Sequence, residues 1–343
     1  MKHYTYSALT ILLAMSAVLF TSESALADDT AVSIAGGGLI PRRETRIVMA
    51  KEVLTLSLDK IVVDYDFRND TNEDVTTEVA FPVPPYENGF PEIGVADQAF
   101  RSFRLWVDGK PVHYRSQAKA TLNGKDVSGV LEANHIDIPT FGHFTETQDS
   151  GGVGVVLDPD FTRLPLVKRK ELVKAGLFDD SEDTRYGLWT VSLQYYWTQT
   201  FPAHSSTHVR HEYTPVAGYR GSIKDGPGPS ANPDSAKEFP QFCIDDRLGG
   251  VLNKIAKTND KNASYYWVDF ILTTANTWKT PIEDFTLIVE RPHRKSELAD
   301  YVSFCWDGLV TKIDSDHFSA RATNLVPTKE LKVGFFGVLK SSF

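Results

Sequence analysis

The sequence predicts a mainly β protein with an antiparallel β-sandwich architecture and one or two short helices, near residues 165–175 and 246–257. Three observations support this fold class. Apolar and polar residues alternate with a period of two in many short segments, turn-forming residues separate these segments, and only two segments have helical features. Short strands at close intervals are typical of antiparallel sandwiches.

The N-terminal residues have the features of an export signal. An apolar run of 13 residues, Ala8–Phe20, precedes small residues that end at Ala27. We therefore expect a signal peptide over residues 1–27, cleavage after Ala27, and a periplasmic or extracellular mature chain. The run is shorter than the roughly 20 residues that a membrane span needs, and no later run reaches that length. No transmembrane segment is expected in the mature chain.

The charge balance restricts the possible partners. The chain has 36 Lys and Arg against 45 Asp and Glu, a formal net charge of −9. Nucleic acids and anionic membranes require a basic footprint, which this balance disfavours. A net negative charge of this size keeps a protein soluble and does not by itself indicate a specific partner.

Residues 28–120 are expected to form an N-terminal β-sandwich region. A first hairpin is predicted from Val63 to Pro85, where two alternating segments flank the polar stretch Asn69–Asp74. A second hairpin is predicted over Phe103–Tyr114, because the turn pair Asp108-Gly109 separates two alternating segments.

Residues 121–220 are expected to contain a loop-rich insertion, a short helix and an aromatic β-hairpin. The helix is predicted over Pro165–Ala175, with Gly176 suited to its C-terminal cap. The hairpin is predicted from Trp189 to Tyr213, where bulky aromatic residues fall on alternate positions. Residues 221–240 are rich in Gly, Pro and Ser and are the expected linker.

Residues 241–343 are expected to form a C-terminal, disulfide-braced β region. Its helix, near 246–257, is amphipathic and starts with acidic residues. Cys243 and Cys305 are the two cysteines, and one disulfide between them is the simplest expectation in an exported chain. It would close a loop of about 60 residues, which stabilises a fold by on the order of 4 kcal/mol. The alternatives are two free thiols or a redox couple, although redox couples usually show Cys-x-x-Cys spacing.

Several sequence blocks resemble a known family. The blocks NDTNEDVTTEVAFPVPP, FRLWVDGKPV, HVRHEYTPVAGY, FCIDD and YVSFCWDGLVTKI occur here in order and across nearly the whole mature chain. They resemble domain of unknown function 4424, a family of exported bacterial proteins. The resemblance implies export, but it assigns no activity, cofactor or catalytic residue.

Histidines near the aromatic hairpin are the densest set of possible metal ligands. His204, His208 and His211 lie close to Glu212 in the sequence. On a strand, however, residues three apart point to opposite faces, so His208 and His211 should not converge on one ion. We therefore predict no metal site and no cofactor, and interpret these residues as polar parts of the hairpin.

Catalytic residues are not predicted either. Asp64 and Asp66 share one face of a strand, and paired carboxylates about 5 to 9 Å apart can hydrolyse glycosidic bonds. Such pairs are common on acidic β-proteins, where they face water. Ser205 and Ser206 lie near His204, but the G-x-S-x-G elbow is absent from the sequence. A non-enzymatic function is therefore favoured, and a hydrolytic activity is the alternative.

Aromatic residues on both faces of several strands suggest a binding surface, because a sandwich buries only one face of each sheet. The predicted binding residues are Trp189, Tyr195, Tyr196, Trp197, His204, His208 and His211. Core and domain-interface packing is the favoured explanation of the aromatic residues as a whole, and the binding surface is its alternative. The first functional hypothesis is a non-enzymatic binding or assembly module, with an envelope polysaccharide or another exported protein as partner. The second is a hydrolase that acts on envelope polysaccharide or peptide.

Overall fold

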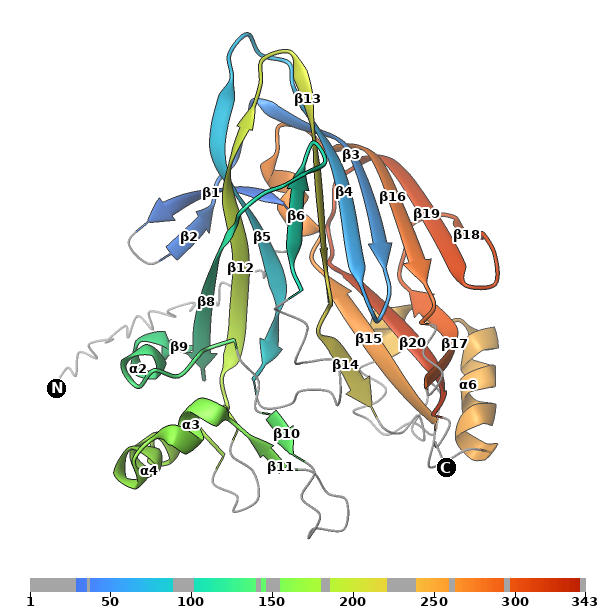
Figure 1. The fold of residues 1–343 in the computed structure, drawn as a ribbon. Coiled ribbons are helices and arrows are strands. Elements are labelled where there is room, and N and C mark those ends of the chain that lie inside the picture. The colour runs from blue at the N-terminus through green and yellow to red at the C-terminus, as the bar shows by residue number, and fades with distance from the viewer. Residues whose placement is uncertain are drawn as a thin grey trace, which may run out of the picture.

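The computed structural model describes residues 29–35, 38–88, 102–139, 143–145, 155–179, 186–220, 239–258, 263–292 and 297–339. Most of these residues lie in β-strands that form packed sheets, so the predicted mainly β fold class is confirmed (Figure 1). The expected signal peptide and nearly all of the expected linker lie outside the described residues.

Two large sheets form most of the molecule. The six-stranded sheet has the order β2 (Gly38–Pro41), β1 (Thr30–Ala35), β5 (Val75–Glu87), β12 (Thr190–Phe201), β8 (Arg115–Leu122) and β9 (Lys125–Asp126). The eight-stranded sheet has the order β18 (Val310–Lys312), β19 (His317–Leu325), β16 (Ile282–Glu290), β3 (Ile47–Leu56), β4 (Ile61–Asn69), β13 (Ser205–Tyr213), β6 (Arg104–Val107) and β7 (Lys110–Pro111).

Two smaller sheets and several short helices complete the described structure. A four-stranded sheet has the order β14 (Ala217–Arg220), β15 (Ala263–Phe270), β20 (Leu331–Leu339) and β17 (Glu297–Phe304), and β10 (His143–Thr145) pairs with β11 (Val155–Leu157). The helices are α2 (Ser128–Ala133), α3 (Pro159–Arg163), α4 (Leu166–Lys174) and α6 (Asp246–Thr258), with 3₁₀ turns at η1 (Phe239–Phe242) and η2 (Thr273–Thr277). The predicted helices correspond to α4 and α6.

The sheets meet face to face over a continuous apolar core. Phe81 of β5 shows the packing: its ring centroid lies 4.2 Å from that of His211 on β13 and 6.2 Å from that of Phe270 on β15. One residue of the six-stranded sheet therefore packs against both the eight-stranded and the four-stranded sheet. This contact pattern is that of a sandwich in which inward-facing side chains interdigitate.

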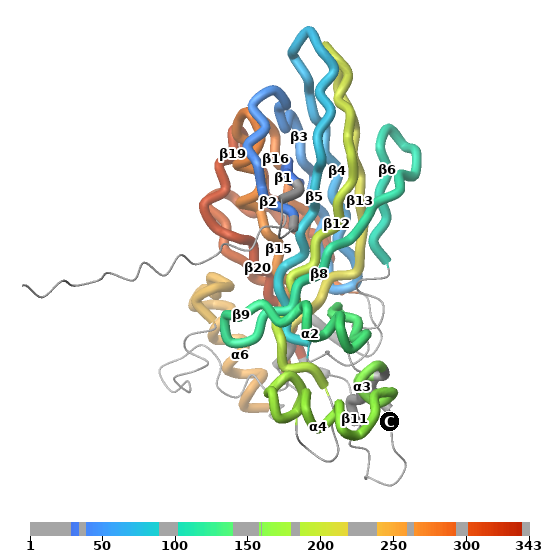
Figure 2. Tube along the Cα trace, turned by 90° about the vertical axis from the view of Figure 1, so that its left-hand side faces the viewer, coloured from blue at the N-terminus to red at the C-terminus, as the bar shows by residue number. Residues whose placement is uncertain are grey.

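The predicted hairpins at Val63–Pro85 and Trp189–Tyr213 are wrong as pairings, although their strands are present. β4 pairs with β3 and β13, whereas β5 pairs with β1 and β12. Each connection therefore crosses from the eight-stranded sheet to the six-stranded sheet or back, as the long tips in Figures 1 and 2 show. Alternation requires only one buried face per strand, and facing strands across a sandwich satisfy it as well as neighbours in a hairpin.

The two crossing loops are joined to each other. Asn69 is fully buried, and its Nδ2 donates to the carbonyl oxygens of Phe201 and Glu73, each at 2.9 Å. The backbone N–H of Ala203 donates to Oδ1 of Asp74 at 2.9 Å. The polar residues of Asn69–Asp74 therefore hydrogen-bond to the second crossing loop, whereas the sequence predicted that they close one hairpin.

The second predicted hairpin is confirmed. β6 and β7 pair around Asp108 and Gly109, whose φ angles are 48° and 74°. Two positive φ angles in a two-residue turn match the right-handed twist of the flanking strands. The Asp-Gly pair predicted this hairpin correctly because these two residue types favour the positive φ angles of a two-residue turn.

The three regions expected from the sequence are interleaved in space. The eight-stranded sheet takes strands from residues 28–120, 121–220 and 241–343. β16 joins this sheet parallel to β3, which is an exception to the expected antiparallel arrangement. A parallel neighbour needs a long crossover, which the intervening chain supplies.

Candidate functional site

Four of the predicted binding residues lie in the core. Trp189, Tyr195, Trp197 and His211 are each at most 3% exposed. Tyr195 and Trp197 lie on the inward face of β12, where the period of two places alternate residues, and Trp189 directly precedes that strand and packs on Phe178. The expectation that these side chains form an exposed binding surface is therefore wrong, because the sandwich interior has room for them.

His211 forms a buried polar pair with the start of the described chain. Its Nε2 lies 3.4 Å from Oδ1 of Asp29, and both side chains are fully buried. Burial raises the pKa of the Asp29 carboxyl above its ordinary value, and the hydrogen-bonding and charge interactions with His211 act in the opposite direction. The rings of Phe81 and Phe103 also surround His211. This pair fixes the N-terminal strand in the core and offers no open reaction site.

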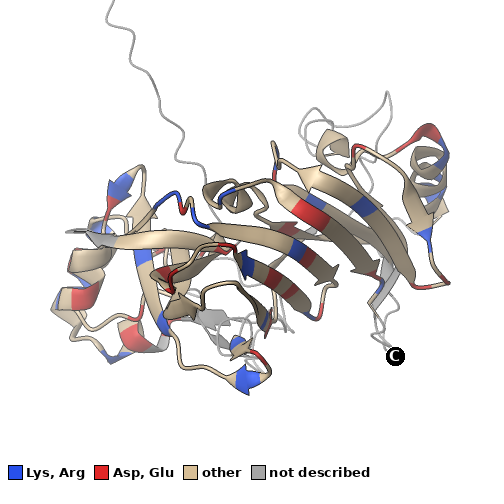
Figure 3. Cartoon of the chain, turned by 90° about the horizontal axis from the view of Figure 1, so that it is seen from above, with Lys and Arg blue, Asp and Glu red and all other residues tan. Residues whose placement is uncertain are grey.

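His208 lies on the opposite face of β13, as the strand period predicted. Its Nδ1 is 2.9 Å from Oδ1 of Asp66, and its Nε2 is 3.3 Å from Oδ1 of Asp64. Arg210 contacts the other oxygen of Asp64 at 2.7 Å. Figure 3 shows basic and acidic positions next to each other on strands of the sheets. Arg210 and Asp64 form an ion pair beside His208 on this outer face, which is a solvent-exposed polar network.

Tyr196 and His204 are the remaining predicted binding residues. The Tyr196 ring is half-buried and carries the guanidinium of Arg115 at 4.4 Å from its centroid. His204 lies in a crossing loop, where a ring nitrogen is 2.8 Å from Oδ1 of Asn72. The seven predicted residues are therefore distributed over the core, two outer sheet faces and a loop, and they form no common site.

A cavity of about 140 Å³ opens elsewhere, beside the disulfide at the C-terminal part of the chain. Its lining comes from the residue before η2, the segment after β17, and the end of β19 with the connection to β20: Leu272, Cys305, Trp306, Asp307, Ala322, Leu325, Val326, Pro327, Thr328, Lys329, Glu330 and Leu331. Most of these side chains are apolar. We call this cavity the Trp306 pocket.

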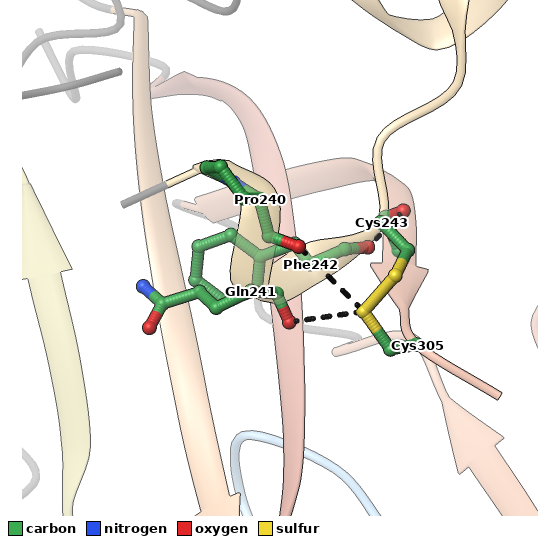
Figure 4. Close-up of a disulfide and its surroundings, with 6 residues drawn as sticks. Pro240, Gln241, Phe242, Cys243 and Cys305 are labelled. Atoms are coloured by element: carbon green, nitrogen blue, oxygen red, sulfur yellow. Dashed lines mark hydrogen bonds between the residues drawn. A yellow bond between two sulfur atoms is a disulfide. The ribbon is translucent and has the colours of Figure 1, made fainter. Parts of the chain in front are cut away.

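The predicted disulfide is present and adjoins the pocket (Figure 4). Cys243 and Cys305 are joined with their Cα atoms 4.9 Å apart. The Sγ of Cys305 also lies 3.4 Å from the carbonyl oxygen of Gln241, so η1 lies against the bond. Phe242 is fully buried next to it and anchors η1 to the four-stranded sheet. The disulfide therefore holds one wall of the pocket in place.

Hydrogen bonds fix the other walls. Glu330 accepts from the backbone N–H of Leu272 at 2.7 Å and from the hydroxyl of Thr273 at 2.5 Å. Asn276 donates to the carbonyl oxygen of Pro327 at 2.8 Å. The Trp306 ring stacks on buried Phe285 at a centroid distance of 5.5 Å. The pocket is thus held in shape by interactions that do not use its open side.

Two exposed apolar side chains lie at or near the pocket. Of the nine large apolar side chains of the described chain that are exposed, Val326 lines the pocket and Leu309 follows the lining residue Asp307 by two positions. Leu309 is 81% exposed and Val326 54% exposed. Clustered exposed apolar residues mark interaction surfaces, whereas single ones do not.

None of the residues predicted to bind a ligand lines the Trp306 pocket. The available signal was the stretch Leu309–Ile313, where apolar residues follow Cys305 and Trp306 without the alternation of a buried strand. The pocket itself combines three segments that are distant in sequence. Among the residues that the structure describes, no three His, Cys, Asp or Glu side chains are grouped so as to hold a metal ion.

Comparisons with known proteins give a family but no activity. The family model described as domain of unknown function (DUF4424) matches residues 27–333. No curated protein matches the sequence. A crystal structure of a Legionella pneumophila protein, provisionally described as nutrient binding, matches with 12% identity and a TM-score of 0.39, covering 90% of this chain and 70% of that one. No helix in the described residues is both long and apolar enough to cross a membrane.

Proposed function

Because the chain belongs to the DUF4424 family of domains of unknown function, whose model covers it almost completely, we propose its function from the geometry alone. We propose that it is an exported, non-enzymatic binding module whose binding site is the Trp306 pocket. Its ligand is a polypeptide partner that inserts one apolar or aromatic side chain into the pocket.

The observation that carries this proposal is the size and lining of the pocket. Its volume of about 140 Å³ is close to the roughly 150 Å³ of an apolar cavity that accepts benzene. Drug-sized ligands occupy pockets of about 300 to 1,000 Å³, so a whole disaccharide is too large for this one. One inserted side chain, with apolar contacts to Leu309 and Val326 around it, fits the arrangement.

The placement of the titratable groups supports binding over hydrolysis. The His211 and Asp29 pair is closed in the core, whereas His208 is engaged by Asp64 and Asp66 on an outer face. The Glu330 carboxylate, which lines the pocket, already accepts hydrogen bonds from the backbone and from a hydroxyl. A hydrolytic site needs such groups to converge on one substrate position.

Ligand titration monitored by NMR tests the proposal with defined probes. N-acetyl-tryptophanamide and N-acetyl-leucinamide should bind the mature protein saturably, whereas N-acetylglucosamine should not. The variant Val326→Asp should abolish the binding, because it places a charge in the apolar lining. Val167→Asp is the matched control, since Val167 is equally apolar and 67% exposed on α4.

Three results would overturn the proposal. They are equal binding by the Val326→Asp variant, preferential binding of N-acetylglucosamine in the pocket, or turnover of an envelope polysaccharide or peptide by the purified protein. The first result would show that the binding site lies elsewhere. The second would show that the ligand is a sugar, and the third would show that the protein is an enzyme.

A further inference from the structure

A second exposed surface lies on α4, at the end of the molecule opposite the crossing-loop tips (Figures 1 and 2). Leu166 and Val167 are 59% and 67% exposed there, although both are large apolar residues. Leu172, on the other side of the helix, is buried and anchors α4 to the core. The helix is therefore held from one side and exposes apolar residues on the other.

Lysines share this exposed side. Residues 166, 170 and 174 are spaced by four, and residue 167 lies next to them in helical projection, so Leu166, Val167, Lys170 and Lys174 follow one face. All four are exposed. We call this set the α4 surface. It combines apolar side chains at the start of the helix with positive charge toward its end.

The local charge is opposite to that of the whole chain. Residues 159–176 contain five Lys and Arg against two Asp and Glu, a net charge of +3 within a chain of net charge −9. The two acids are engaged locally: Glu171 pairs with Lys168 at 2.7 Å, and Asp160 with Arg163 at 2.6 Å. Among the described residues, Lys170 and Lys174 have no ion-pair partner. Their charge is available to an external anion.

We propose that the α4 surface docks the protein peripherally on an anionic phospholipid bilayer. A basic residue near such a surface gains free energy from the negative surface potential, and apolar side chains can insert at the boundary between headgroups and acyl chains. α4 protrudes, so it can approach a planar surface. The overall acidic balance disfavoured this partner, but docking depends on the local face.

Vesicle co-sedimentation with the full mature chain tests this proposal. Vesicles of phosphatidylcholine with about 30 mol% phosphatidylglycerol should bind the protein at low ionic strength, and pure phosphatidylcholine should not. Salt at about 0.5 M should release it, because exposed charges are then screened. The double variant Lys170→Glu/Lys174→Glu should reduce the partition coefficient by about tenfold or more.

The matched control is Lys254→Glu/Lys257→Glu on α6, which changes the total charge equally with exposed helical lysines at another site. Val167→Asp should weaken vesicle binding, and Val326→Asp in the Trp306 pocket should not. Equal loss in the α6 variant, equal binding to pure phosphatidylcholine, or no vesicle binding would overturn the proposal. Binding of soluble polyglutamate instead of vesicles would replace the bilayer by an acidic polypeptide as partner.

Discussion

Individual polar side chains have large effects in this fold when they are buried between the sheets. Asn69 is the clearest example, because its amide serves two crossing loops that come from distant parts of the chain. Its Oδ1 also accepts from the backbone N–H of Thr71 at 3.0 Å. A buried carbonyl that loses its donor costs about 1 to 3 kcal/mol, so a single amide is decisive here.

The substitution Asn69→Asp should therefore lower the free energy of unfolding by about 3 kcal/mol, because it replaces the donor for Phe201 and Glu73 with an acceptor of the same shape. Urea denaturation measures the change. Asn72→Asp, on the exposed part of the same loop, is the control and should stay within about 0.5 kcal/mol of the natural protein. Equal effects of the two substitutions would show that the Asn69 hydrogen bonds do not stabilise the loops.

Elements at the C-terminal end depend on a covalent connection. α6 packs on the four-stranded sheet through a small cluster, separate from the main core, that includes Leu252, Phe242 and Phe336. The disulfide joins the segment before α6 to the end of β17, and Ser303 of β17 donates to the carbonyl oxygen of Phe242 at 2.8 Å. The helix is thus held by a modest apolar contact and a bond that closes a long loop.

Removal of the disulfide by Cys243→Ser/Cys305→Ser should lower the free energy of unfolding by about 4 kcal/mol, as the chain-entropy model gives for a loop of this length. Chemical denaturation of the two proteins measures the difference. Thiol titration of the natural protein, denatured without reductant, should detect no free thiol. Two reactive thiols, or an unchanged stability in the variant, would contradict the assignment of a stabilising disulfide.

The molecule as a whole is organised by sharing strands between distant parts of the chain. β16 and β19 lie in one sheet with β3 and β4, although β14, α6 and β15 intervene in the sequence between β4 and β16. Phe285 on β16 and Tyr65 on β4 belong to the same continuous core. Neither half of the chain can therefore bury its apolar sheet face without the other.

We accordingly expect one cooperative unfolding transition for the described fold. Far-UV circular dichroism and tryptophan fluorescence should give coincident denaturation curves, because tryptophans occur in strands of both large sheets. A chain that ends before residue 239 should fail to fold, since β3 would lose its pairing partner β16 and Phe81 would lose the packing of Phe270 on β15. Two separated transitions, or a folded truncated chain, would show that the regions are independent.

The sequence by itself determined the strands, both longer helices, the Asp108-Gly109 hairpin and the pairing of two cysteines. Each of these follows from local chemistry. Apolar and polar residues alternate in the strands, turn and capping residues mark the hairpin and the helix ends, and two cysteines allow only one disulfide. The split of His208 and His211 to opposite faces followed from the same strand period.

Only the tertiary structure decided which strands are neighbours and which way their apolar faces point in space. A period of two specifies that β4 and β5 each bury one face, but not whether the two faces lie side by side or opposite one another. Tyr195 and Trp197 are core for that reason, and Trp189 is buried against Phe178 and Ile138, which are distant from it in sequence or outside the strands. The Trp306 pocket is assembled from segments distant in sequence, so the apolar stretch Leu309–Ile313 alone could not locate it. Long-range packing, which has no short-range signature, determined where the proposed binding pocket lies.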